Sequence, residues 1–291
     1  MYKGRFAPSP TGPLHLGSLV TAAASYLDAR AHGGEWLVRM EDVDEPRCSP
    51  AHASVILRQL EAYGLAWHGE VIYQSRRTEA YHEALDDLRR RGLVFACGCT
   101  RRKLGGGEFY PGTCRSGVEP GAAARAWRLR VDAVPVLFQD RWCGDQREVL
   151  SETVGDFVLR RADGFCAYQL AVVVDDGWQG ITHVVRGADL LASTARQIFL
   201  QRALALTQPR YLHVPVVTGA GGHKLSKQTR AEPLPESDRA GVLRQALVQL
   251  GLAAPVATLE ESWNWAITQW PLTCISRQPP EAPISGLAVR P

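Results

Sequence analysis

The fold is decided by the stretch Arg5-Phe6-Ala7-Pro8-Ser9-Pro10-Thr11-Gly12-Pro13-Leu14-His15-Leu16-Gly17-Ser18. A short apolar run over residues 4–7 leads into a loop of Pro, Ser, Thr and Gly, and a helix-like run follows over residues 16–31. Strand, tight loop and helix in this order point backbone N–H groups at an anion. Neither the dinucleotide-binding G-x-G-x-x-G pattern nor the Walker A pattern is present. If this loop handles a nucleotide, it must therefore do so in another way.

A second strand is predicted over residues 36–40, after the helix ends near Gly33. Strand, helix and strand in close succession indicate a right-handed βαβ unit with parallel strands. Ligands of such sheets lie beyond the carboxyl ends of the strands. The second of these ends carries Glu41, Asp42 and Asp44, whose carboxylates could bind an amine, a metal or ribose hydroxyls. A solvated acidic turn is an equal alternative on spacing alone.

The second half of the sheet is predicted after residue 165. The largely apolar run over residues 165–176 is typical of a strand that is covered on both faces. We expect the following elements after it: a strand over 181–186, a helix over 190–206 and a last strand over 211–217. Arg186 ends one of these strands, where it could hold a carboxylate bidentately. A structural ion pair with Asp189 or Asp176 is the alternative.

A glycine-rich loop over residues 219–228 follows the last predicted strand and carries Lys224, Ser226 and Lys227. Flexible glycines let such a loop close, and two ammonium groups can neutralise the charge that develops on a triphosphate. An exposed basic turn is the alternative interpretation.

Three cysteines, Cys97, Cys99 and Cys114, lie in a segment rich in glycine. Thiols at this spacing suit a zinc knuckle, which needs a fourth ligand. The nearby candidates are Tyr110, Glu108, His82 and a water molecule. Ordinary thiols in a loop are the alternative.

The chain is expected to divide at the edges of this segment. Residues 126–138 alternate between apolar and charged, which predicts a strand, and the surrounding residues read as short strands and turns. Near the end of the chain, helices are predicted over residues 237–250 and 259–270, the second with a capping box from Thr258 to Glu261. The predicted division is a first half of a parallel α/β domain (1–92), an insertion (93–165), a second half (166–230) and a short helical C-terminal segment (231–291).

The composition is ordinary for a soluble protein. The 291 residues are 45% hydrophobic and 22% charged, and a net charge of +3 is weak evidence for a nucleic-acid partner. No apolar run is long enough for a membrane span, and the N-terminus lacks a signal-peptide core. We therefore expect a cytoplasmic protein whose seven cysteines are reduced. With no clear interface in the sequence, we expect a monomer.

Taken together, the loops resemble the two signature motifs of class I aminoacyl-tRNA synthetases. His15-Leu16-Gly17-Ser18 looks like the HIGH element, and Lys224-Leu225-Ser226-Lys227-Gln228 looks like the KMSKS element. The flanking motifs are similar to those of the glutamyl subgroup: Arg5 to Gly12, Arg39 to Asp44, Tyr73-Gln74-Ser75 and Arg186 to Leu190. The fold implied is α/β, with a Rossmann-like parallel sheet, an inserted zinc-binding subdomain and a short helical C-terminal segment.

Within this subgroup the chain is most similar to the short glutamyl-Q tRNA(Asp) synthetase family. The sequence stops about 60 residues after Lys227, so we expect no anticodon-binding domain. The lysine loop has the Lys-Leu-Ser-Lys-Gln sequence of that family. The segment with the three cysteines and Tyr110 matches the zinc site of the same family. The resemblance thus implies one structural Zn²⁺ per chain with these ligands: Cys97, Cys99, Tyr110 and Cys114.

The activity that the resemblance implies has two steps. Glutamate and ATP with Mg²⁺ give glutamyl-adenylate and pyrophosphate, without a need for tRNA. The glutamyl group then passes to a hydroxyl on the cyclopentene ring of queuosine, at the wobble position of tRNA(Asp). The expected substrates are therefore ATP, L-glutamate and a queuosine-containing tRNA(Asp).

The resemblance also implies which residues form the site. The glutamate site would comprise Arg5, Phe6, Ala7, Pro8, Ser9, Glu41, Tyr168 and Arg186, with Glu41 facing the ammonium group. The ATP site would comprise His15, Gly17, Lys224, Ser226 and Lys227, of which His15, Lys224 and Lys227 would be catalytic. Because the substrate carboxylate is itself the nucleophile, catalysis would consist of positioning and of charge neutralisation at the α-phosphate.

Three other functions compete with this interpretation. A minimal glutamyl-tRNA synthetase would charge the 3′ adenosine of tRNA instead. Small ligases of the pantothenate synthetase type share a HIGH-like motif and a lysine loop, but they lack the motifs at Arg39–Asp44 and Arg186–Asp189. A non-catalytic RNA-binding module would not need the intact His15, Gly17 and lysines.

Overall fold

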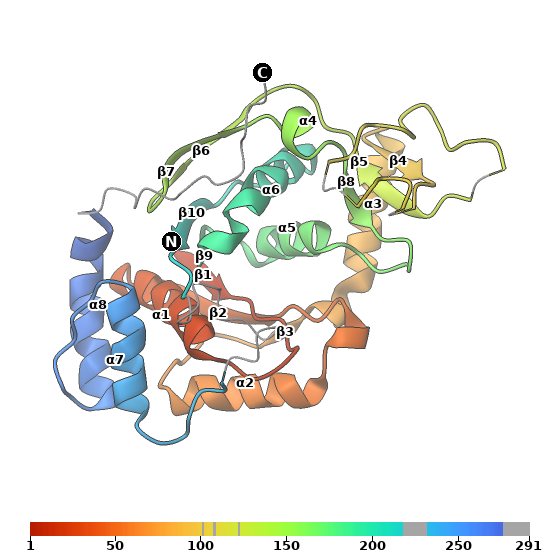
Figure 1. Ribbon diagram of the computed structural model, residues 1–291. Helices are drawn as coiled ribbons and strands as arrows, with labels where there is room; N and C mark the ends of the chain where they lie inside the picture. The colour runs from red at the N-terminus through yellow and green to blue at the C-terminus, as the bar shows by residue number, and fades with distance from the viewer. Residues whose placement is uncertain (101, 107–108, 122, 218–231, 276–291) are drawn as a thin grey trace.

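A parallel sheet in two parts forms the centre of the molecule (Figure 1). The computed structural model describes residues 1–100, 102–106, 109–121, 123–217 and 232–275. One part has the order β1 (Lys3–Phe6), β2 (Glu35–Met40), β3 (Ile72–Tyr73). The other has the order β7 (Gly144–Glu148), β6 (Val136–Asp140), β10 (Arg210–Val214), β9 (His183–Gly187), in which only the β6–β7 pair is antiparallel. The Thr182 N–H donates to the Lys3 carbonyl (2.9 Å), which holds β1 beside β9. The predicted α/β fold with a parallel sheet is confirmed.

Helices cover both parts of this sheet. The predicted helix over residues 16–31 is α1 (Leu16–Ala31), and it is buried along most of its length. The others are α2 (Pro50–Ala62), α3 (Thr78–Arg90), α4 (Leu150–Thr153), α5 (Tyr168–Gln179), α6 (Leu191–Ala203), α7 (Arg239–Gln249) and α8 (Leu259–Ile275). Short 3₁₀ turns are η1 (Glu45–Arg47), η2 (Gln74–Arg77) and η3 (Ala188–Leu190). Among the described residues, no helix is both long and apolar enough to cross a membrane.

The strand predicted over residues 165–176 is wrong, because most of this run lies in α5. The helix contacts α3, α6 and β8, so it has no broad polar face, and Leu170, Ala171, Val172 and Val173 are all buried. An apolar run without a period of two or of 3.6 residues cannot distinguish a buried strand from a buried helix. Gly180, with a φ of 66°, ends the helix.

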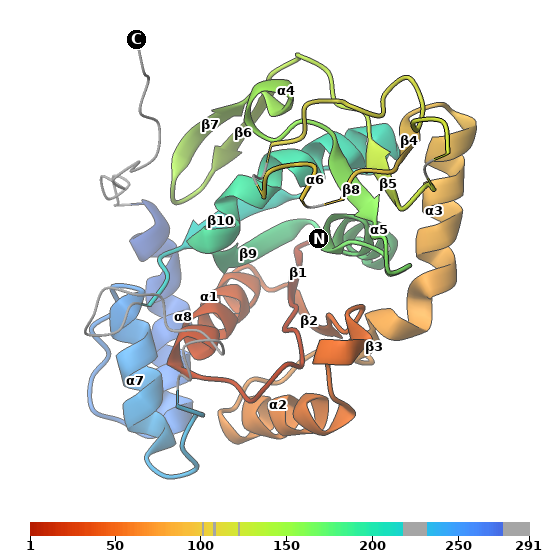
Figure 2. The same cartoon turned by 45° about the vertical axis from the view of Figure 1, so that its right-hand side comes forward.

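The predicted insertion contains a small sheet of its own. β4 (Val94–Cys97), β5 (Ala126–Leu129) and β8 (Phe157–Arg160) form an antiparallel sheet in the order β4-β5-β8, at the upper right of Figure 2. The single strand predicted over residues 126–138 is wrong, because β5 ends at Leu129 and β6 begins at Val136 in a different sheet. The hairpin of β6 and β7 extends the central parallel sheet beside β10.

The C-terminal helices α7 and α8 pack beside α1 in both views (Figures 1 and 2). The indole of Trp263 donates to the Tyr63 carbonyl (2.8 Å), and the indole of Trp270 donates to buried Asp28 (2.9 Å). The predicted capping box is present, since the hydroxyl and N–H of Thr258 both bond the Glu261 carboxylate (2.7 and 2.9 Å). The two tryptophan contacts fasten α8 to α1 and to the C-terminal end of α2.

Candidate active site

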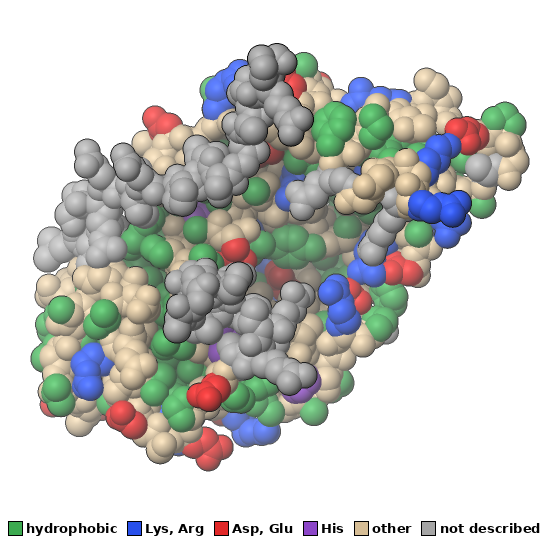
Figure 3. All heavy atoms as spheres, in the orientation of Figure 1, with side chains coloured by type: hydrophobic (Ala, Val, Ile, Leu, Met, Phe, Trp, Pro, Cys, Tyr) green, Lys and Arg blue, Asp and Glu red, His purple; other side chains and the backbone are tan. Residues whose placement is uncertain are grey.

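A cavity of about 510 Å³ opens where the carboxyl ends of β1, β2 and β9 meet. Figure 3 shows the molecule hollowed near the centre of this face, with acidic side chains in the hollow. The cavity is lined by all the predicted glutamate residues and by two of the predicted ATP residues: Arg5, Phe6, Ala7, Pro8, Ser9, Glu41, Tyr168, Arg186, His15 and Gly17. The remaining predicted residues, Lys224, Ser226 and Lys227, lie outside the described residues.

Backbone hydrogen bonds join the two loops at the floor of the cavity. The Glu41 N–H donates to the Pro8 carbonyl (3.0 Å), and the Ser49 N–H donates to the Pro10 carbonyl (3.0 Å). His15 is the N-cap of α1, and its Nδ1 accepts from the Ser18 N–H (3.3 Å). The N-terminus of α1 therefore borders the cavity, and a helix N-terminus favours bound anions.

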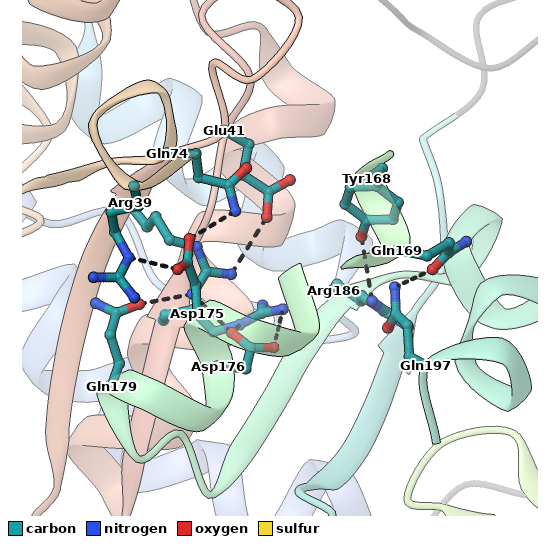
Figure 4. Close-up of polar contacts among 12 residues, drawn as sticks. Arg39, Glu41, Gln74, Tyr168, Gln169, Asp175, Asp176, Gln179, Arg186 and Gln197 are labelled. Carbon is teal, nitrogen blue, oxygen red and sulfur yellow. Dashed lines mark hydrogen bonds and ion pairs between the residues drawn. The ribbon is translucent and has the colours of Figure 1, made fainter. Parts of the chain in front are cut away.

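A network of buried charges lies beneath the cavity (Figure 4). Asp176 of α5 accepts from Arg5 (Nε–Oδ1 3.0 Å, Nη2–Oδ2 3.2 Å) and from Arg39 (Nη1–Oδ1 2.8 Å). Arg39 also donates to Glu41 (3.3 Å) and to Gln179 (2.7 Å). Burial raises the pKa of Glu41 although both arginines oppose it, whereas the two arginines hold the pKa of Asp176 low against its own burial.

The neighbouring Asp175 faces a different set of partners. Its carboxylate accepts from the Gln74 amide (3.0 Å), the Tyr81 hydroxyl (2.6 Å) and Arg77 Nε (2.6 Å). Residues Asp175 and Asp176 therefore join α5 to elements of the first half of the chain, which are β1, β2, η2 and α3. Our sequence reasoning missed these roles, although two carboxylates that end an apolar run are a usable signal, since buried charges must be paired.

Arg186 is buried and reaches the cavity from β9. It donates to His213 Nε2 (3.0 Å), Thr194 Oγ1 (2.9 Å), Tyr168 Oη (3.4 Å) and the Leu190 carbonyl (3.5 Å). Figure 4 shows the Tyr168 hydroxyl directed at Arg186, apart from the network around Asp176. Among the described residues no carboxylate pairs with Arg186, so the alternative of a structural ion pair is wrong.

The predicted metal ligands come together in the predicted insertion. The sulfur atoms of Cys97, Cys99 and Cys114 lie within 4.8 Å of one another, so this cluster could hold a metal ion. The Tyr110 hydroxyl lies 3.5 Å from Cys97 Sγ and accepts from the Cys114 N–H (2.8 Å). Of the other candidate ligands, Glu108 lies outside the described residues, and His82 is not in the cluster.

The chemistry of this cluster fits a cation that prefers sulfur. Burial by itself raises the pKa of Cys97, but hydrogen bonds from Tyr110, the Cys99 backbone and Arg128 outweigh it, so that this pKa is lowered. Arg128 Nε lies 3.4 Å from the Cys97 sulfur and its guanidinium stacks on the Tyr110 ring at 3.9 Å. A donor of this kind orients a ligating thiolate and offsets its charge.

The sequence matches known proteins along most of its length. The family model for the catalytic domain of class I tRNA synthetases (E and Q) matches residues 2–107 and 122–255. The glutamyl-Q tRNA(Asp) synthetase of Thiobacillus denitrificans is 55% identical over an alignment of 287 positions that covers 95% of each chain. The chain belongs to the glutamyl-Q tRNA(Asp) synthetase family. A second member of the glutamyl-Q tRNA(Asp) synthetase family, from Dechloromonas aromatica, is 56% identical over 290 residues, 95% of this chain and 96% of its own.

Solved structures of larger synthetases resemble this member of the glutamyl-Q tRNA(Asp) synthetase family. A glutamate-tRNA synthetase from Elizabethkingia anophelis is 27% identical, with a TM-score of 0.69 over 78% of this chain and 52% of its own. A glutamate tRNA ligase from Elizabethkingia meningosepticum, solved in complex with its amino acid, is 26% identical, with a TM-score of 0.67 and the same coverage. The chain thus spans about half the length of these two synthetases.

Proposed function

We propose that this chain activates L-glutamate with ATP and Mg²⁺ and transfers the glutamyl group to queuosine in tRNA(Asp). Relatives that share 51–56% of their residues with it over nearly the full chain carry the name glutamyl-Q tRNA(Asp) synthetase. The activation step needs no tRNA in this proposal. The product of that step is glutamyl-adenylate.

The charge distribution in the cavity carries the proposal. Arg186 reaches the cavity without a carboxylate partner among the described residues, and Glu41 supplies a carboxylate to the same cavity from a side chain that is 10% exposed. Glutamate offers one ammonium group and two carboxylates, which complement these groups. We assign Glu41 to the ammonium group and Arg186 with Tyr168 to a substrate carboxylate. The loop from Arg5 to Ser9 would enclose the rest of the amino acid.

The chemistry requires positioning rather than a protein nucleophile. The substrate α-carboxylate attacks the α-phosphate of ATP, and pyrophosphate leaves. His15 and Gly17 at the N-terminus of α1 would lie against the nucleotide. Lys224, Ser226 and Lys227 would bind its phosphates, and Mg²⁺ would neutralise the charge on the leaving pyrophosphate.

The cysteine cluster would hold a structural Zn²⁺ in this proposal. Three thiolates and the Tyr110 phenolate would give it the four ligands of a closed tetrahedral site. Such an ion would fix the three-stranded sheet of β4, β5 and β8 as an inserted subdomain. The domain division at residues 92, 165 and 230 belongs to the same proposal.

Labelled glutamate distinguishes this function from charging of the tRNA 3′ end. The enzyme is incubated with ATP, [¹⁴C]glutamate and tRNA(Asp) that either contains queuosine or carries guanosine at the same position. Nuclease digestion and chromatography then locate the label. We expect label on queuosine and none on the guanosine-containing tRNA, whereas label on the terminal adenosine would favour the minimal glutamyl-tRNA synthetase.

A further inference from the structure

We propose that His213, held by Asp140, is a positioning residue that gives Arg186 a fixed and uncharged acceptor. The charge of Arg186 thereby remains available to the side-chain carboxylate of the substrate, which glutamine lacks, and this favours glutamate over glutamine. This inference rests on the proposed function and deepens it. Neither Asp140 nor His213 lies among the residues that the sequence motifs single out.

His213 is completely buried on β10, directly opposite Arg186 of β9 in the register of the two parallel strands. Its Nδ1 lies 2.6 Å from Asp140 Oδ2, and its Nε2 lies 3.0 Å from Arg186 Nε. Asp140 is fixed in turn, because its Oδ1 accepts from the backbone N–H groups of Trp142 (3.0 Å) and Cys143 (2.8 Å). A continuous series of hydrogen bonds therefore runs from Asp140 at the end of β6, through His213, to Arg186 in the cavity.

The contacts of the His213 ring with Asp140 and Arg186 define its tautomer, and Thr194 Oγ1 also lies 3.2 Å from Nε2. An ionised carboxylate only accepts hydrogen bonds, so Nδ1 carries the proton that points to Asp140. A guanidinium only donates, so Nε2 must offer a lone pair to Arg186. Burial lowers the pKa of His213, and the pKa of Asp140 is about 2 because His213 and two backbone N–H groups outweigh its burial. The imidazole is therefore neutral, and Asp140 is ionised, at neutral pH.

The surroundings of the two cavity arginines differ in charge. Asp176 accepts two hydrogen bonds from Arg5 and neutralises it. The four acceptors of Arg186 are all uncharged: His213 Nε2, Thr194 Oγ1, Tyr168 Oη and the Leu190 carbonyl. The carboxylate of Asp140 contacts the opposite side of the His213 ring. Asp140 thus fixes the orientation of the His213 ring, and the ring in turn orients Arg186. Because the ring lies between them, the Asp140 carboxylate does not contact Arg186.

This separation matters for the choice of substrate. A protein carboxylate in direct contact with Arg186 would compete with the side-chain carboxylate of glutamate for the same N–H donors. The amide of glutamine is neutral and needs no free charge, so such a contact would weaken glutamate binding far more than glutamine binding. Arg186 held by neutral acceptors is oriented and still charged, as recognition of glutamate requires.

Two pairs of variants test the inference by ATP–pyrophosphate exchange with glutamate and with glutamine. His213→Gln keeps a neutral acceptor near Nε2, and His213→Leu removes it. Thr194→Asp places a carboxylate on Arg186 from α6, and Thr194→Asn, which keeps a neutral oxygen acceptor of similar size, is its uncharged control. Thermal unfolding of each variant identifies any that does not fold, and the Thr194 pair leaves the Asp140–His213 bond intact.

We expect His213→Leu and Thr194→Asp to raise KM for glutamate by about 10-fold or more, with a smaller change in kcat, because a charged hydrogen bond is lost or redirected. Both changes should reduce the preference for glutamate over glutamine, and His213→Gln and Thr194→Asn should largely keep it. Equal glutamate KM and equal preference within each pair would overturn the inference. If the wild-type enzyme shows no exchange with glutamate, the proposed function itself fails.

Discussion

Arg5 and Asp176 form a buried two-point ion pair although 171 positions separate them in the sequence, with Nε–Oδ1 and Nη2–Oδ2 distances of 3.0 and 3.2 Å. The pair joins β1, at the start of the first half of the sheet, to α5 of the second half. Arg39 of β2 shares the same carboxylate. The floor of the cavity is therefore assembled by electrostatics between segments distant in sequence.

Asp176→Asn is expected to destabilise the fold strongly. The substitution removes the negative charge that Arg5 and Arg39 share and leaves both arginines buried. Removing one partner of a buried ion pair lowers the free energy of unfolding by about 3–5 kcal/mol. The free energy of unfolding in urea measures the effect. Asp86→Asn is the matched control, because Asp86 pairs with Arg89 on the surface of α3 and such pairs contribute about 1 kcal/mol or less. Equal losses in the two variants would contradict the role assigned to Asp176.

Cys114→Ser is expected to abolish metal binding, because it removes one thiolate from the cluster. Atomic emission of the purified proteins should find about one zinc per wild-type chain and close to none in the variant. Cys166→Ser is the control, since Cys166 is buried but lies outside the cluster. Zinc retained equally by both variants, or absent from the wild type, would argue against the site.

Stability is expected to fall as the pH drops from about 6.5 to about 4, in part because of His183. Burial lowers the pKa of this histidine to about 4, from 6.5 in the unfolded chain. Between these values the unfolded chain binds a proton that the folded one does not, so one such group lowers stability by at most about 1.4 kcal/mol per pH unit.

His183→Phe tests this contribution, because the ring of residue 183 stacks on Tyr2 at 4.0 Å and phenylalanine preserves an aromatic ring there. The slope of unfolding free energy against pH should become smaller without vanishing, since burial lowers the pKa of His213 too. A slope identical to that of the wild type would exclude His183 as its source.

The parts of the fold with a local signal could be predicted from the sequence. The glycine after residue 32 and the small apolar residues of α1 define that helix, and the predicted glutamate loop lines one cavity with Glu41 and Arg186. The long apolar run of α5 was misassigned, because a helix enclosed on several sides carries no polar face to give it a period. The partners of Asp176 and His213 depend on contacts between distant segments, which spacing cannot reveal.

Lys227→Ala is expected to reduce ATP–pyrophosphate exchange by at least about 100-fold, the scale on which removal of a main charge stabiliser acts. The prediction follows from the position of Lys227 in the KMSKS-like motif. Lys103→Ala is a suitable control, because Lys103 is exposed in the inserted segment and pairs with Glu119. Near-normal exchange in the Lys227 variant would remove that residue from the catalytic set.

The most direct test of the central claim is ATP–pyrophosphate exchange by the wild-type chain with glutamate and without tRNA. Among the described residues, the charges around Glu41 and Arg186 are arranged in the chain alone, which supports the proposal that glutamate activation needs no RNA. We predict glutamate-dependent exchange in the absence of tRNA, with glutamine a much poorer substrate. Exchange that appears only after tRNA is added, or that never depends on glutamate, would contradict this account.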